Sequence, residues 1–144
     1  LAIVKLAIDH IFEIEQAYGE NIRDMLFKKL AEVLQQTSRT HDAVARAQFN
    51  EFVLILPECS KTGAVMKAER IRRLIAKQNW LENRMKITLS VGISEYPSLS
   101  STAEGLDDNA SKALNHIQEK SGDKICVYKM AENHQPEFTV DEGG

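Results

Sequence analysis

Apolar residues recur along this chain in two patterns, continuous short runs and stripes at helical spacing, and the runs predict the strands. Residues 2–8 are apolar apart from Lys5, and residues 51–56 form a second apolar run that Pro57 closes. Such runs are typical of strands covered on both faces. Residues 86–95 instead alternate between apolar and polar side chains, which predicts a further strand.

Helices are expected between these strands, because apolar residues return there every three or four positions. A short helix is expected at residues 11–17, ending before Gly19. A longer helix at residues 21–37 presents a core-facing stripe of Ile22, Leu26, Leu30, Val33 and Leu34. Ser60 is a suitable N-cap for a third helix, with a stripe of Ala64, Ala68, Ile71 and Ile75. The chain then predicts a helix at 105–120 and a strand at 124–128.

Residues 40–48 are expected to pass from a loop into a strand that forms a hairpin with residues 51–56. The predicted order is then β-α-α-β-β-α-β-α-β, which contains a βαββαβ arrangement of the ferredoxin-like type with additions. We therefore expect an α+β fold with a central, mostly antiparallel sheet flanked by helices. One domain is expected over residues 1–130, and the polar, acidic residues 131–144 are interpreted as a tail or linker. Since Leu1 begins inside an apolar run, we expect the chain to be part of a longer protein with other domains.

Composition narrows the class of protein. The chain has 144 residues, of which 43% are hydrophobic, enough for one domain with its own core. Its formal net charge of −3 lacks the basic excess of a general nucleic-acid binder, and we expect neither nucleic acid nor membrane contact for this domain. Cys59 and Cys126 are not in metal-type spacing, which favours thiols in the cytoplasm, even where the longer protein is membrane-anchored.

Several short strings occur in a fixed order along the chain. They are Leu-Ala-Ile-Asp-His at 6–10, Tyr-Gly at 18–19, Asp24 and Leu26, Arg46 before Gln-Phe-Asn-Glu-Phe at 48–52, and Leu-Ser-Val-Gly-Ile-Ser at 89–94. In this order and spacing, the chain resembles the GGDEF domain of diguanylate cyclases over about residues 1–130. An active member of that family joins two GTP molecules into cyclic di-GMP, with two divalent metals on the phosphates.

The positions that the resemblance assigns to metal and phosphate binding carry other residues here. The first metal aspartate falls at Ala7, the third signature residue at Asn50, and the two signature glycines at Gln48 and Phe49. Alanine has no ligand oxygen on its side chain, and an amide takes no proton near neutral pH. Glycine lets the backbone approach the phosphates with positive φ, whereas a phenylalanine would fill that space.

Further family positions concern the phosphates and the guanine base. The phosphate-contacting lysine falls at Phe12, a later Lys/Arg pair at Gln118 and Gly122, and the guanine-recognising asparagine at Glu15. The residues that match the family are Asp9, Asp24, Glu51 and Phe52, and Asp24 matches its second guanine contact. For Asp9 and Glu51 a structural interpretation also holds, as turn hydrogen bonds and sheet-end charge. We therefore expect no catalytic residue, no bound metal, no cofactor and no enzyme activity.

A second family site is present in the sequence. Arg39-Thr40-His41-Asp42 lies five residues before the signature, where the resemblance implies a product-inhibition site for cyclic di-GMP. An arginine fork can donate to guanine O6 and N7, and an aspartate can accept from guanine N1–H and N2–H₂. Arg70 matches a position where some relatives place an additional arginine. The alternative is that Arg39 and Asp42 form a local ion pair or cap.

These residues predict a signalling module that binds cyclic di-GMP at Arg39, Asp42 and Arg70 and acts on other domains of a longer protein. A homodimer is a further expected assembly. Two alternatives stay open at this point: a protein-interaction or dimerisation module without nucleotide, and a weak GTP-binding regulatory domain.

Overall fold

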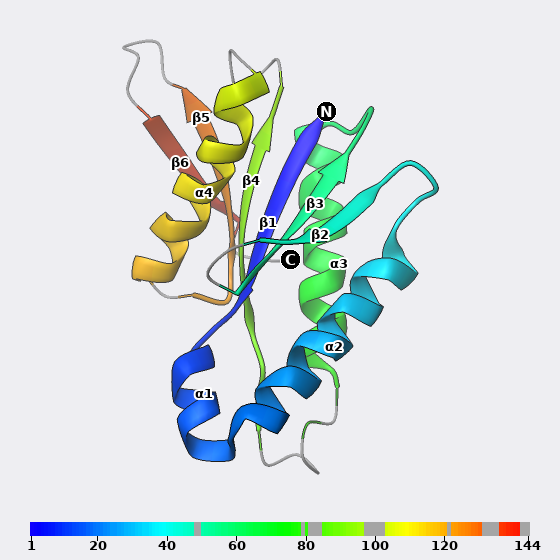
Figure 1. Cartoon of the computed structure of the whole chain (residues 1–144). Coiled ribbons are helices and arrows are strands. Elements are labelled where there is room, and N and C mark those ends of the chain that lie inside the picture. Colours follow the sequence, from blue (N-terminus) through cyan, green and yellow to red (C-terminus); the bar gives the residue numbers. More distant parts are fainter. Residues whose placement is uncertain are drawn as a thin grey trace.

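The computed structural model describes residues 1–47, 50–78, 80, 85–96, 103–120, 122–130 and 136–141 (Figure 1). Within these ranges the elements follow in the order β1 (Ala2–Ile8), α1 (Ile11–Tyr18), α2 (Glu20–Thr37), β2 (Ala43–Arg46), β3 (Glu51–Leu56), α3 (Lys61–Ala76), β4 (Leu89–Glu95), α4 (Ala103–Lys120), β5 (Ile125–Met130) and β6 (Pro136–Asp141). The predicted order of nine elements is confirmed, and β6 is an addition to it.

The strands form one sheet in the order β2-β3-β1-β4-β5-β6. The apolar strand β1 is central, antiparallel to β3 on one side and to β4 on the other. Strands β4 and β5 are parallel, with α4 as the crossover between them, whereas β6 returns antiparallel to β5. The α+β class and the mostly antiparallel sheet are therefore as expected from the sequence.

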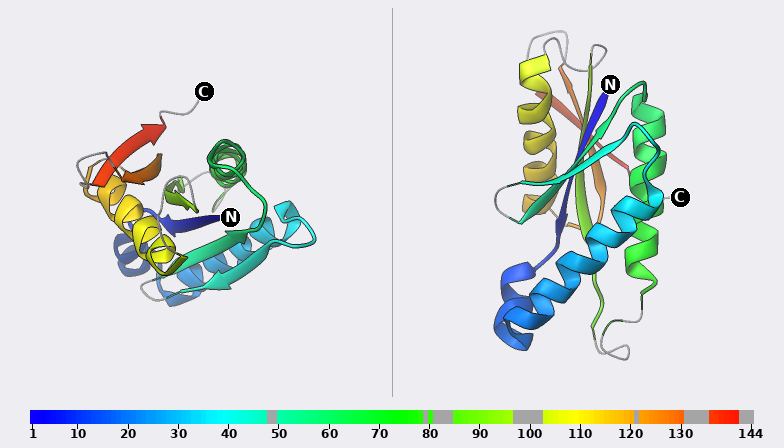
Figure 2. Two further views of the ribbon diagram at one scale, coloured as in Figure 1. Left: turned by 90° about the horizontal axis from the view of Figure 1, so that it is seen from above. Right: turned by 45° about the vertical axis from the view of Figure 1, so that its right-hand side comes forward.

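Helices cover both faces of the sheet (Figure 2). Helices α2 and α3 pack on one face, where Leu26, Leu34 and Ile71 meet Leu6 of β1 in the larger core cluster. Helix α4 packs on the other face, over a smaller cluster that includes Ala7. Its approach is closest at Gly92 of β4, where an added Cβ would collide with the backbone nitrogen of Leu114 and lie 2.8 Å from its Cα. Glycine is therefore required there for close packing.

Two expectations about the strands need correction. Strand β4 begins at Leu89 rather than at residue 86. Residues 136–141, which the sequence analysis placed in a polar tail, form strand β6. The reason is that Phe138 packs against the sheet, with its ring stacked on His116 at 4.4 Å and edge-on to Tyr128 at 5.9 Å. The rest of the predicted tail, residues 131–135 and 142–144, lies outside the described residues.

Among the described helices, none has the length and apolar character needed to cross a lipid bilayer.

Candidate functional site

A cavity of about 370 Å³ lies at the end of the sheet, where β1 runs into α1, and we refer to it as the sheet-end pocket. It is lined by Ala7, Ile8, Asp9, His10, Ile11, Phe12, Glu13, Asn50, Gln118, Lys120 and Gly122. The pocket thus brings together five positions that the resemblance assigns to the family's catalytic site, Ala7, Phe12, Asn50, Gln118 and Gly122. Phe12 is 70% exposed, so its ring faces solvent at this site.

The carboxylate of Asp9 is occupied by hydrogen bonds from the protein. The hydroxyl of Thr88 donates to Oδ2 at 2.7 Å, that of Ser90 donates to Oδ1 at 2.6 Å, and the backbone N–H of Asp123 donates to Oδ2 at 2.9 Å. Gly122 packs against the same carboxylate, with φ of 62°, so close that a Cβ would lie 3.0 Å from Oδ1. Asp9 therefore holds the turn after α4 to the end of the sheet.

That turn is also fixed from the other face of the sheet. Arg72 of α3 donates to Asp123 Oδ1 at 2.6 Å and to Glu69 at 2.9 Å. Burial tends to raise the pKa of Glu69, but hydrogen bonds from Arg72 and Arg73 outweigh it, so the pKa lies below its ordinary value. A chain of charged groups thus connects α3 to the carboxylate of Asp9.

Glu51, the fourth signature residue, is half-buried at the start of β3. Burial raises its pKa, the charge of Lys5 opposes the rise, and the charge of Asp107 adds to it. Lys5 is itself buried under α4, where its ammonium donates to Asp107 at 3.1 Å and to the hydroxyl of Ser111 at 2.6 Å. Glu51 thus lies near an ion pair between the buried Lys5 and the exposed Asp107.

The resemblance implies divalent metals at this place, and the donors present do not fit them. Ala7 offers no side-chain oxygen, and both oxygens of Asp9 already accept hydrogen bonds. Across the described ranges, no group of three His, Cys, Asp or Glu side chains is arranged to hold a metal ion. We therefore derive no chemical step that runs through a metal.

The remaining family positions are placed as follows. Glu15 and Asp24 do not line the sheet-end pocket; Arg23 lies between them, 2.9 Å from a Glu15 oxygen and 3.1 Å from a carboxylate oxygen of Asp24. Gln48 and Phe49, the two signature-glycine positions, lie outside the described residues.

The second predicted site forms a compact turn between α2 and β2. The backbone N–H of Arg39 donates to Asp42 Oδ2 at 2.8 Å, and the N–H of Asp42 donates to the Arg39 carbonyl at 3.1 Å. Asp42 is buried, with a side chain only 1% exposed, whereas that of Arg39 is 61% exposed. Burial tends to raise the pKa of Asp42, but the Arg39 N–H and the charges of Lys67 and Arg39 outweigh it and lower the pKa.

Two adjoining cavities open at this turn, and both are lined by Arg39. One, of about 500 Å³, is lined by Arg39, Thr40, His41, Asp42, Pro57 and Glu58. The other, of about 350 Å³, is the α2–α3 cavity, lined by Thr37, Arg39, Cys59, Gly63, Met66, Lys67 and Arg70. The structure therefore brings Arg39 and Arg70, 31 positions apart in the sequence, to one cavity.

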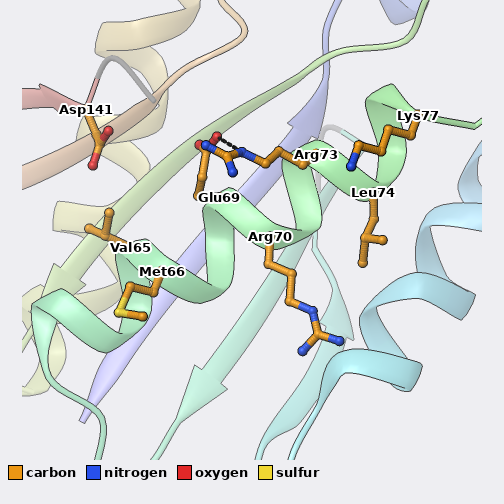
Figure 3. A pocket seen from close by; sticks show the side chains of 8 residues that line it. All are labelled: Val65, Met66, Glu69, Arg70, Arg73, Leu74, Lys77 and Asp141. Carbon is orange, nitrogen blue, oxygen red and sulfur yellow. Dashed lines mark hydrogen bonds and ion pairs between the residues drawn. The ribbon is translucent and has the colours of Figure 1, made fainter. Parts of the chain in front are cut away.

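A third cavity, of about 430 Å³, continues along α3 from Met66 and Arg70 (Figure 3). Its wall includes Leu74 of the same helix, Lys77 just after the end of the helix, and Asp141 of β6. Figure 3 shows Arg73 turned toward Glu69, with which it forms an ion pair of 2.9 Å, whereas Arg70 extends away from that pair. Arg70 therefore lines two neighbouring cavities.

Sequence reasoning missed two lysines that line these sites. Lys67 lines the α2–α3 cavity, and Lys120 lines the sheet-end pocket. The signal for Lys67 was its place three residues before Arg70, beside the apolar stripe of α3, which puts both side chains near one face. Lys120 lies between Gln118 and Gly122, the two positions at which the resemblance implies cations.

Comparisons with known proteins identify the family and the fold of the chain. The family model described as "Diguanylate cyclase, GGDEF domain" matches residues 1–124. Uncharacterized protein YhcK of Bacillus subtilis is 30% identical over 134 residues, which cover 91% of this chain and 37% of that protein. Diguanylate cyclase A of Treponema denticola is 28% identical over 131 residues, covering 90% of this chain and 35% of that protein. The chain thus spans about a third of these relatives.

Among solved structures, the active GGEEF domain of a diguanylate cyclase from Vibrio cholerae superimposes with a TM-score of 0.82 at 21% identity, covering 90% of this chain and 83% of that one. The GGDEF domain of DgcB from Caulobacter crescentus, in complex with c-di-GMP, gives a TM-score of 0.77 at 20% identity, covering 88% of this chain and 76% of that one. These likenesses establish the fold.

The chain therefore belongs to the GGDEF family and is a signalling module of the cyclic di-GMP pathway. This finding corrects one sequence-based expectation. The expectation that the domain is not an enzyme is contradicted, because the matching family model is that of diguanylate cyclases and a relative aligned over 90% of the chain is named a diguanylate cyclase. That expectation rested on single positions, such as Ala7 and Asn50, where the residue differs from the family's. Single positions do not outweigh a family match over residues 1–124.

Proposed function

We propose that this domain binds cyclic di-GMP in the α2–α3 cavity, through Arg39 and Arg70. The observation that carries the proposal is that the fold brings these two arginines, from separate elements, to one cavity. A guanidinium offers a planar fork of donors to the O6 and N7 edge of guanine, and it also stacks on a base. Two arginines at one cavity suit a ligand with two guanines and two phosphates.

The local ion pair, which was the alternative interpretation, does not compete with this role. Asp42 is held mainly through the backbone N–H of Arg39 at 2.8 Å, while the Arg39 Nε lies farther away, at 3.5 Å. The guanidinium therefore stays 61% exposed while the turn is closed. Direct acceptance by Asp42 from guanine N1–H and N2–H₂, as expected from the sequence, stays a prediction, because its carboxylate is buried beneath Arg39.

The wider role follows from the partial coverage of the relatives. Since the chain spans about a third of the two relatives described above, we propose that it acts as one domain of a longer protein whose other domains respond to ligand binding. The likeness to a c-di-GMP complex of the same fold supports the choice of ligand. A homodimer and a cytoplasmic location belong to the same proposal.

The test is calorimetric titration of the chain with cyclic di-GMP and, separately, with GTP. We expect binding of cyclic di-GMP, and its loss in Arg39→Ala and Arg70→Ala, because each removes an exposed donor fork from the cavity. Lys112→Ala is the matched control, since it removes one exposed positive charge from α4, on the opposite face of the sheet. Unchanged affinity in both arginine variants, or heat with GTP alone, would contradict the proposal.

A further inference from the structure

Lys67 lies beneath the proposed ligand site and joins three elements. It is part of α3, one turn before Arg70, and its side chain is only 13% exposed. Its ammonium lies 3.4 Å from Asp42 Oδ2 and donates to the backbone carbonyl of Thr37. Because Thr37 is the last residue of α2, this one side chain ties the end of α2 and the Arg39–Asp42 turn to α3.

The end of α2 is well suited to a cation. The last four carbonyls of a helix have no partner within the helix, and they carry the negative end of its dipole. Here the hydroxyl of Thr37 donates to the Val33 carbonyl at 2.8 Å, and that of Ser38 donates to the Leu34 carbonyl at 2.6 Å. The carbonyl of Thr37 is left for Lys67. The ammonium thus has two partners of negative character, the carbonyl of Thr37 and the carboxylate of Asp42.

The exposure of the three charged groups follows a clear order. The side chain of Asp42 is 1% exposed, that of Lys67 13% and that of Arg39 61%. A ligand that enters the cavity therefore meets the exposed guanidinium, whereas the ammonium of Lys67 lies in the cavity wall and is paired with Asp42. An ion pair so placed fixes the turn whose backbone carries Arg39, since Asp42 accepts the backbone N–H of that residue.

We infer that Lys67 is a positioning residue for the ligand: acting through Asp42, it holds the 39–42 turn in the conformation that presents Arg39 to cyclic di-GMP. The inference rests on the proposed function and assigns to Lys67 and Asp42 the role of a buried anchor. Arg39 and Arg70 supply the exposed guanidinium groups that meet the ligand. Fixing a binding loop before the ligand arrives reduces the conformational entropy that binding must overcome.

The experiment measures cyclic di-GMP affinity by calorimetry in four variants. Lys67→Met keeps the length of the side chain without its charge, Lys67→Arg keeps the charge, and Asp42→Asn removes the charge of the partner. The fourth is the double variant Lys67→Met/Asp42→Asn. We expect Lys67→Met and Asp42→Asn each to weaken binding about tenfold, as for loss of one coupled charge pair. The double variant should be no weaker than either single one, and Lys67→Arg should recover most of the affinity.

The outcomes separate this inference from the proposed function. No binding by the unaltered chain overturns both. Binding by the unaltered chain with Lys67→Met within about twofold of it overturns the inference alone. Additive losses in the double variant would also overturn it, because they would show that Lys67 contacts the ligand directly. Circular dichroism establishes that each variant folds; if Lys67→Met does not, Asp42→Asn and Lys67→Arg carry the test.

Discussion

The sheet-end pocket and the turn at residues 39–42 belong to the same fold, yet their charged groups are arranged in opposite ways. In the sheet-end pocket the carboxylate of Asp9 is occupied by three donors of the protein. At the turn the carboxylate of Asp42 is also occupied, but this arrangement leaves the guanidinium of Arg39 directed to solvent. A carboxylate that accepts hydrogen bonds from the protein can thus either be used up within a site, as Asp9 is, or support an exposed cation, as Asp42 does.

The largest effect on stability is expected from Gly92→Ala, which acts on the helix that lines the sheet-end pocket. The added Cβ would collide with the backbone of Leu114 and displace α4, which carries Gln118 and Lys120 to the sheet-end pocket. We expect the free energy of unfolding to fall by about 3 kcal/mol, as for overpacking against rigid backbone. Urea denaturation measures this.

Gly63→Ala is the control for that change, because the Cβ there would meet side-chain atoms rather than backbone, the Cys59 Sγ at 3.1 Å and the Ser60 Oγ at 3.6 Å. Equal stability of the two variants would contradict the close packing of α4. Cyclic di-GMP affinity should survive in Gly92→Ala, because the α2–α3 cavity is formed by elements on the other face of the sheet.

The second prediction concerns Asp9→Ala, which leaves the hydroxyls of Thr88 and Ser90 and the N–H of Asp123 without their acceptor. We expect a loss of about 2 kcal/mol in unfolding free energy, since unpaired donors at a half-buried place are costly. Thermal and urea unfolding measure it. Asp24→Ala serves as the control, because its carboxylate is 64% exposed. Equal stability of the two variants would mean that Asp9 does not hold the turn after α4.

The third prediction compares the titration of Asp42, in the 39–42 turn, with that of Glu51, at the start of β3. The pKa of Asp42 is lowered, so its contribution to stability is present above the pKa of the unfolded chain and is lost as pH falls through the folded value. Burial raises the pKa of Glu51, so ionised Glu51 costs stability, and that cost disappears as pH falls. Carboxyl carbon shifts in an NMR titration should show Asp42 titrating below Glu51; the reverse order would contradict the contrast.

The smallest effect concerns the two cysteines. Burial raises the pKa of Cys126 to about 11, and the thiolate is the reactive form, so Cys126 should resist alkylation. Cys59 is partly exposed and lines the α2–α3 cavity. We expect a maleimide to modify Cys59 first, and cyclic di-GMP to slow that reaction, as followed by mass spectrometry. Modification of Cys126 first, or a Cys59 rate indifferent to the ligand, would count against the proposed location.

Much of the fold could be predicted from the sequence, because continuous apolar runs and helical stripes are local signals. Strand β3 was predicted with its observed bounds, and Ser60 caps α3 through its side-chain oxygen, which accepts from the N–H of Gly63. Strand β6 was missed although Phe138 and Val140 alternate with polar residues, because this alternation is short and lies within a polar, acidic segment. Its two apolar side chains pack against the core cluster on the α4 side of the sheet, a contact that only the fold shows.

The candidate sites were predictable only in part. The resemblance predicted a site at Arg39, Asp42 and Arg70, and the fold brings the two arginines to one cavity. Lys67 pairs with Asp42, 25 residues away, and Arg72 pairs with Asp123, 51 residues away. No local sequence pattern predicts pairs so far apart along the chain. The absence of activity was wrongly inferred from single positions such as Ala7, whereas the whole-domain comparison identifies a diguanylate cyclase domain.

The central claim is that cyclic di-GMP binds at the α2–α3 cavity rather than at the sheet-end pocket. Backbone amide NMR spectra of the chain, recorded during titration with cyclic di-GMP, locate the ligand directly. The account predicts that the largest shift changes fall on residues 39–42 and on α3 around Gly63, Lys67 and Arg70. Changes confined to residues 7–13 and to the end of α4 would contradict it and would move the ligand to the sheet-end pocket.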